Sequence, residues 1–215
     1  MSNGVIITGT SCAGKTSVSR LMTKADESYV VAKAVTTRKK RDDDVQGDYD
    51  YVDINIFNKY KINDELIVSS SYRNDFYGIL RSEAVRILNM NRMPIFVITP
   101  SSIMEIKSNS KGIRLLTFFL DADDAQLSER YLHRNMRYCD SSFAEQNRKD
   151  RLYIKDAEYL IKNDVLELAK KAIMTLHRHH LDYSILYDSG VIKHGNFTNY
   201  YEHINANKNH KFSAN

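Results

Sequence analysis

The chain has few of the features that are typical of secreted proteins, membrane-spanning proteins or proteins stabilised by a structural metal ion. Two of its 215 residues are cysteines, Cys12 and Cys139, which give neither a disulfide framework nor a zinc-binding spacing. No apolar run approaches the roughly 18 residues of a membrane span. The first residues also lack the pattern of a secretory signal peptide. We therefore expect a cytoplasmic protein whose thiols are reduced.

The excess of positive charge is also small. The chain has 31 Lys and Arg residues against 27 Asp and Glu residues, a formal net charge of +4. This excess is too weak to argue for nucleic acid as a partner, but it suits a small anionic substrate. We expect no nucleic-acid and no membrane partner, and a homodimer is left open. The length suits one domain.

A phosphate-binding signature lies near the start of the chain. The segment from Gly9 to Thr16 reads Gly-x-x-x-x-Gly-Lys-Thr, after an apolar run at 5–8 and before a predicted helix at 17–23. Between a strand and a helix, this spacing is that of the P-loop, whose backbone amides surround nucleotide phosphates. Lys15 is expected to reach the β- and γ-phosphates, and the Thr16 hydroxyl to bind Mg²⁺. The residues expected to hold the nucleotide here are Gly9, Ser11, Cys12, Ala13, Gly14, Lys15, Thr16 and Ser17.

Strand patterns alternate with helix patterns along the rest of the chain. The predicted strands lie at 29–32, 66–68, 78–80, 94–98, 113–120 and 159–161. The predicted helices begin at Asp53 and lie at 82–89, 101–107, 123–136 and 164–176. This order predicts an α/β P-loop NTPase fold, with a five-stranded, mainly parallel sheet between helices. The polar, aperiodic segment 189–215 predicts a flexible C-terminal tail.

Two further groups of residues suit a second phosphate and a phosphate in transfer. The segment from Thr36 to Arg41 reads Thr-Thr-Arg-x-x-Arg, and it is followed by Asp-Tyr-x-Tyr-Val at 48–52 and Tyr-Gly at 77–78. Guanidinium groups fit phosphate oxygens bidentately, and phenols add neutral donors. Arg130 and Arg134 lie one helical turn apart, so they can neutralise charge on a transferring phosphoryl group together.

In this order, these motifs resemble the guanylate kinase family over about residues 5–176. The acceptor-binding segment of that family reads T-T-R-x-x-R, then D-Y-x-F-V, then Y-G-T. The resemblance implies one kinase domain over 1–188, with a core at 1–33, 81–122 and 155–188. It also implies an acceptor-binding part at 34–80 and a helical lid at 123–154.

The resemblance also implies the roles of individual residues. Mg-ATP would be the donor, and the acceptor would be a nucleoside monophosphate or a similar small phosphorylated molecule. The residues implied to hold the acceptor phosphate are Arg38, Arg41, Tyr49 and Tyr77. Those implied to act in catalysis are Lys15, Arg38, Arg130, Arg134 and Arg148, with Arg151 as the open alternative to Arg148. Asn163 would lie beside the adenine of ATP, although Asn-Asp is also an ordinary cap between a strand and a helix.

The chain departs from the family pattern where guanine is read. Ala34, Val68 and Ile79 stand where the family has a Ser, a Glu and a Thr or Ser. We count Val68 and Ile79 among the substrate-contacting residues, but apolar side chains cannot offer guanine its hydrogen bonds, so GMP is expected to be a poor acceptor. If the alignment shifts by one residue, the polar role falls to one of four others: Ser69, Ser70, Ser71 or Asn74.

A second departure concerns the metal. The family carries Asp-x-Asp after the central strand, whereas this chain has Thr99 and Pro100 there. A carboxylate near Mg²⁺ is therefore in doubt, and Asp121 is a weak substitute. Phosphoryl transfer depends more on positioning and charge than on a strong base, so the expected activity survives this loss.

The sequence thus predicts an ATP-dependent kinase that phosphorylates the phosphate of a small acceptor. Two alternatives stay open. One is a sugar-phosphate kinase on the same fold, which would share the ATP half and differ in the acceptor. The other is a non-catalytic guanylate-kinase-like module that binds proteins, and the intact P-loop signature argues against it.

Overall fold

The computed structural model describes residues 2–42, 44–72, 74–135 and 141–188. The chain divides into two compact units, residues 1–177 and residues 178–215. All residues discussed below as a site belong to the first unit. Cys139 and the predicted tail at 189–215 lie outside the described residues.

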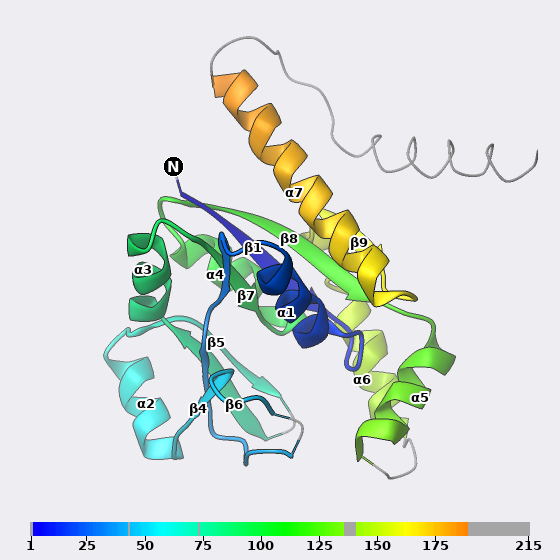
Figure 1. Ribbon diagram of the computed structural model, residues 1–215. Coiled ribbons are helices and arrows are strands. Elements are labelled where there is room, and N and C mark those ends of the chain that lie inside the picture. Colours follow the sequence, from blue (N-terminus) through cyan, green and yellow to red (C-terminus); the bar gives the residue numbers. More distant parts are fainter. Residues whose placement is uncertain (1, 43, 73, 136–140, 189–215) are drawn as a thin grey trace, which may run out of the picture. The chain divides into compact units, whose positions relative to one another are not determined.

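A five-stranded parallel sheet forms the core of the first unit (Figure 1). Its strands lie in the order β2-β7-β1-β8-β9, and every neighbouring pair is parallel. The strands are β1 (Ser2–Gly9), β2 (Tyr29–Val31), β7 (Met93–Val97), β8 (Ile113–Asp121) and β9 (Tyr159–Lys162). The interior strands read as continuous apolar runs because both faces of a parallel sheet are covered. The predicted five-stranded sheet is confirmed.

Helices lie between the strands of the chain, and the last helix follows β9. They include α1 (Lys15–Ala25), α3 (Arg81–Asn89), α4 (Ile103–Asn109), α5 (Asp124–Asn135), α6 (Ser141–Arg151) and α7 (Leu166–Asp188). Short 3₁₀ turns, Pro100–Ser102 and Ile154–Asp156, precede α4 and β9. Helix α1 packs on β1, β2 and β7, which places the start of α1 at the carboxyl end of β1. None of the described helices is long and apolar enough to cross a membrane.

A second, four-stranded sheet holds the segment expected to bind the acceptor. Its strands are β3 (Ala34–Thr36), β4 (Tyr49–Tyr51), β5 (Leu66–Tyr72) and β6 (Asp75–Leu80), in the order β4-β3-β6-β5. Helix α2 (Ile54–Ile62) packs on this sheet through the buried ring of Phe57. The predicted start of α2 is confirmed, because the Asp53 carboxylate accepts hydrogen bonds from the amides of Asn55 and Ile56.

This second sheet and several helix boundaries differ from the prediction. The predicted strands covered only the apolar parts of β5 and β6, and β3 and β4, which have three residues each beside a charged loop, were missed. Short strands of mixed burial give no clear alternation, so periodicity does not detect them. Helix α1 extends beyond the predicted 17–23 at both ends. Helix α7 begins at Leu166 rather than at Asp164, and it continues beyond the predicted end at Leu176.

Candidate active site

The P-loop joins the end of β1 to the start of α1, and its backbone depends on two glycines. Gly9 has a φ of 137° and Gly14 a φ of 88°, in the region that L side chains rarely adopt. A Cβ at Gly9 would lie 1.9 Å from the carbonyl oxygen of Leu120, and a Cβ at Gly14 would lie 2.5 Å from Nδ2 of Asn163. Cys12 also has a positive φ, 64°. Leu120 and Asn163 approach the loop so closely that a side chain would not fit at Gly9 or Gly14, which explains the glycine at each of these positions.

The Lys15 ammonium group lies inside this loop. Its Nζ donates hydrogen bonds to the carbonyl oxygens of Gly9, at 2.8 Å, and Thr10, at 2.7 Å. Burial lowers the pKa of Lys15, and the negative charge of Asp150 on α6 opposes this effect. The cation is thus held inside the loop by two of the loop's own carbonyl oxygens.

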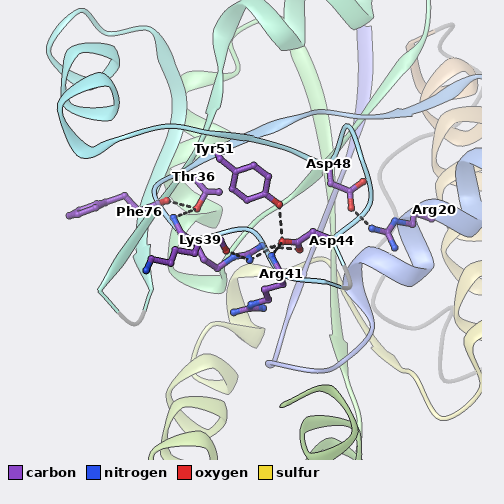
Figure 2. Close-up of polar contacts among 9 residues, drawn as sticks. Arg20, Thr36, Lys39, Arg41, Asp44, Asp48, Tyr51 and Phe76 are labelled. Atoms are coloured by element: carbon purple, nitrogen blue, oxygen red, sulfur yellow. Dashed lines mark hydrogen bonds and ion pairs between the residues drawn. The ribbon is translucent and has the colours of Figure 1, made fainter. Parts of the chain in front are cut away.

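The loop that joins β3 to β4, residues 37–48, is called here the acceptor loop. It is organised by Asp44 (Figure 2). The Arg38 guanidinium pairs with both carboxylate oxygens of Asp44, at 2.9 Å each. Asp44 also accepts hydrogen bonds from the Arg41 amide, at 2.7 Å, and from the Tyr51 hydroxyl, at 2.8 Å. The side chains of Arg38 and Asp44 are only 6% and 4% exposed, so this bidentate pair is held away from solvent.

These contacts fix the charge of each partner. Burial opposes ionisation of Asp44, but the hydrogen bonds from Arg38, Arg41 and Tyr51 outweigh it and hold the pKa of Asp44 well below its usual range. Burial and the bond to Asp44 raise the pKa of Tyr51 to about 12. Burial likewise raises the pKa of Tyr49. The loop therefore presents a charged guanidinium group beside neutral phenols at ordinary pH.

One pocket gathers side chains from the P-loop, the second sheet and the lid. Its walls include eight of the predicted functional residues with charged or hydroxyl side chains: Ser11, Lys15, Thr16, Arg38, Arg41, Tyr49, Tyr77 and Arg134. Two predicted substrate-contacting residues, Val68 and Ile79, also line this pocket, together with Ala34. The Arg38 guanidinium carbon lies 5.2 Å from the centre of the Tyr49 ring, within the range of a cation–π contact. Two separate anion-binding groups thus line one cavity.

A second pocket also borders the P-loop. Its lining includes Gly14, Lys15, Thr16, Ser17, Arg130, Arg134 and Asn163, together with Tyr49 and the carboxylates of Asp44, Asp48 and Asp164. Asn163 donates from Nδ2 to the Ala13 carbonyl oxygen, and Arg130 donates to the Asn163 carbonyl oxygen, each at 2.7 Å. Nη1 of Arg130 and Oδ1 of Asn163 are buried and have no hydrogen-bond partner in the described part of the chain. Such buried polar atoms suit a polar ligand, and Mg-ATP phosphates fit the lining of this pocket.

The structure does not bring every predicted residue to these pockets. Ala13 is fully buried and lines neither of them. Arg148 is exposed on α6 and also lines neither of them. Its alternative, Arg151, pairs instead with Asp121, at 2.8 Å, and with Asp124, at 2.7 Å.

The carboxylate suggested as a metal ligand has other partners. Asp121 accepts a hydrogen bond from the Thr10 hydroxyl, at 2.8 Å, in addition to its pair with Arg151. Helix α6 meets the P-loop at a second point, where the Asn147 side chain accepts a hydrogen bond from the Ser11 amide, at 2.9 Å. Asp121 and Asn147 therefore join the P-loop to the lid helix, and Asp121 serves that contact in this structure.

Three side chains near the site were missed by the sequence analysis. Asp44 holds Arg38, Asp150 lines the first pocket near Lys15, and Asp48 pairs with Arg20 of α1 (Figure 2). Asp44 and Asp48 lie in a run of charged residues, where nothing in the sequence separates a buried acid from a solvated one. The available signal was position alone, because Asp44 follows Arg41 closely and Asp48 directly precedes Tyr49.

Comparisons with known proteins identify the family of the chain. The family described as Guanylate kinase matches residues 1–180. The guanylate kinase of Rhizobium meliloti (strain 1021) is 24% identical over 176 residues, which cover 80% of each chain. That of Mesomycoplasma hyopneumoniae (strain 7448) is 32% identical over 126 residues, 56% of this chain and 64% of the relative.

The fold has a solved counterpart. The crystal structure of guanylate kinase from Anaplasma phagocytophilum superposes with a TM-score of 0.67 at 17% identity, covering 89% of this chain and 97% of that one. This likeness supports the α/β P-loop NTPase fold. Together with the family match over residues 1–180, it shows that the chain belongs to the guanylate kinase family.

Proposed function

We propose that this chain is an ATP-dependent kinase that transfers the γ-phosphoryl group of Mg-ATP to the phosphate of a nucleoside monophosphate. One observation carries the proposal. Lys15 and Thr16 from the P-loop line the same pocket as Arg38 and Arg41 from the acceptor loop. Two anion-binding groups that face one cavity suit a reaction in which two phosphates must meet in line.

The residues divide the work between donor and acceptor. The P-loop amides and Lys15 would hold the donor phosphates, and the Thr16 hydroxyl would hold Mg²⁺, which supplies positive charge between the β- and γ-phosphates. Arg38 would bind the acceptor phosphate, because its guanidinium group lines the pocket and is held in orientation by Asp44 and by the carbonyl oxygen of Lys39. Arg134 lines both pockets, so its charge is placed to act on a group that passes between them.

The acceptor is proposed not to be GMP. The three positions where the family reads guanine hold Ala34, Val68 and Ile79, and all three side chains line the pocket. Hydrogen-bonding groups of guanine placed against these side chains would lose their water without gaining partners, which costs affinity.

Two measurements on the purified chain test this proposal. Mg-ATP should raise the melting temperature, because a ligand at about 100 times its dissociation constant stabilises the fold by about 2.7 kcal/mol. A coupled ADP-release assay with a panel of nucleoside monophosphates and sugar phosphates should then find an acceptor, with GMP turned over poorly. Absence of any shift with Mg-ATP would contradict the kinase proposal. If a sugar phosphate were the best substrate, the donor half would stand and the nucleotide acceptor would be wrong.

A further inference from the structure

One wall of the acceptor pocket is apolar and is built across three strands. Ala34 on β3 lies opposite Ile79 on β6, and Val68 on β5 lies opposite the same Ile79. Val68 and Ile79 are each 2% exposed and belong to one hydrophobic cluster, against which Ala34 packs. This wall is held by the register of the sheet and by the core behind it, so it is a rigid feature of the pocket.

The polar side chains that line this pocket include several neutral hydroxyls. Ser70 and Tyr72 on β5 line the pocket, as do Thr99 and Ser102 after β7. The hydroxyls of Thr99 and Ser102 lie 3.0 Å apart, so they share a hydrogen bond. A hydroxyl both donates and accepts, which suits a ring that carries carbonyl oxygens and one N–H group.

Carboxylate and amide side chains near this wall are committed elsewhere. Glu105 on α4 accepts from the amide of Ser69, at 3.0 Å, and from its hydroxyl, at 3.4 Å. Asn109 donates to the carbonyl oxygen of Ile67 at 3.0 Å. Among the described residues that line the pocket, the one carboxylate is Asp150, whose charge acts on Lys15 at the P-loop end.

These features select among nucleotide bases. Cytosine and guanine carry amino groups that carboxylates accept best, and adenine is read by the side-chain amides of Asn or Gln. Thymine has no amino group, its carbonyls and its N–H can bond to hydroxyls, and its methyl group seeks apolar contact. We infer that the acceptor is thymidylate, a monophosphate whose pyrimidine ring carries a methyl group; this inference rests on the function proposed above.

The test is a comparison of five deoxynucleoside monophosphates with the intact chain and saturating Mg-ATP. Because the sugar and phosphate are constant, differences in kcat/KM report the base alone. We expect dTMP to be the best acceptor, and dTMP to exceed dUMP by about 10-fold or more, the usual effect of one carbon group in an apolar pocket. A preference for dGMP, or equal use of dTMP and dUMP, overturns the inference and leaves the proposed kinase standing.

A pair of variants locates the methyl-binding wall. Val68→Thr places a hydroxyl in the wall at nearly constant volume, so the ratio of kcat/KM for dTMP to that for dUMP should fall several-fold. The control is Val35→Thr, at a buried position of the same sheet that does not line the pocket. The ratio does not depend on the folded fraction, so partial unfolding of either variant does not obscure it. An unchanged ratio in Val68→Thr overturns the assignment of this wall.

Failure of the inference and failure of the proposed function give different results. If no monophosphate is phosphorylated while Mg-ATP still stabilises the fold, thymidylate is wrong and the donor site stands. If Mg-ATP gives no stabilisation and no acceptor is used, the kinase proposal itself is wrong.

Discussion

The P-loop and the acceptor loop are both built to meet phosphate, but by different means. The P-loop depends on its backbone conformation, with Gly9 and Gly14 at positive φ, and the side chains of Thr10 and Ala13 within it are fully buried. The acceptor loop uses side chains, and Asp44 holds Arg38 in place through a bidentate pair. We therefore expect the P-loop to fail through changes of conformation, and the acceptor loop to fail through the loss of one carboxylate.

The largest effect is expected at the cation that serves the P-loop. Lys15→Met should lower kcat by about 100- to 1,000-fold, the usual loss when one donor to a transition-state oxygen is removed. Steady-state kinetics with the best acceptor measures this effect. The control is Lys24→Met, in the last turn of the same helix and exposed. Equal activity in both variants would contradict the role proposed for Lys15.

A smaller effect, but one specific to the acceptor, is expected at Asp44. Asp44→Asn removes the charge that orients Arg38, and a hydrogen bond to a charged group contributes about 1.5–3 kcal/mol. The KM for the acceptor should rise by about 10- to 100-fold, whereas the KM for ATP changes little. The matched control is Asp42→Asn, an exposed acid of the same loop. An equal rise in both KM values would show that the loop does not belong to the acceptor alone.

The same carboxylate gives the acceptor loop a pH dependence. Because the pKa of Asp44 is lowered in the folded chain, its stabilising effect is full above the unfolded value of about 3.9 and is lost as pH falls towards the folded value. The difference in unfolding free energy between the wild type and Asp44→Asn should therefore be constant from pH 7 to 5 and shrink below pH 4. Urea unfolding at several pH values measures it, and a difference that grows on acidification would refute the assignment.

Alanine substitutions at two glycines distinguish the cost of a strained backbone from the cost of a steric clash. Gly14→Ala and Gly47→Ala both place a side chain at positive φ, which costs about 1–2 kcal/mol. A Cβ at Gly14 would also meet Asn163, whereas a Cβ at Gly47 meets nothing within 4 Å. Gly14→Ala should therefore lose more stability in urea and also lose affinity for ATP. Equal losses of stability in the two variants would mean that the Asn163 side chain moves away from the new methyl group at no energetic cost.

The smallest effect is expected at the ion pair between the two regions. The side chains of Arg20 on α1 and Asp48 in the acceptor loop are 33% and 21% exposed, so the pair contributes at most about 1 kcal/mol. Arg20→Ala should lower the free energy of unfolding by that amount in low salt and by less in high salt. A loss that does not depend on salt would point to packing rather than charge.

The difference between the two regions also explains what the sequence could predict. The P-loop signature and the Asp53 cap are local, so their geometry follows from a few adjacent residues. The role of Asp44 appears only when the loop folds back on Arg38, and nothing in the run of charges separates it from Asp42.

The lid gives a second example of a feature that the sequence alone does not predict. Arg148 was a reasonable candidate by position, but α6 turns Phe143, Asn147 and Asp150 inward, and the Asn147 side chain contacts the P-loop. Adjacent residues on a helix point in different directions, so the burial of Asn147 leaves Arg148 exposed. Packing decides which face of a helix turns towards the site, and the positions of arginines in the sequence do not show which face that is.

The contact between Arg20 and Asp48 has a thermodynamic consequence. It joins α1, which begins in the P-loop, to the end of the acceptor loop directly before Tyr49. A movement of α1 therefore changes the position of Asp48, and a movement of Asp48 changes that of α1. Coupling of this kind is reciprocal: if one substrate tightens the bond on arrival, it raises the affinity of the other by the same factor. An ion pair of this kind would therefore add the same coupling free energy to the binding of either substrate, and so strengthen the complex with both substrates without changing which one binds more tightly alone.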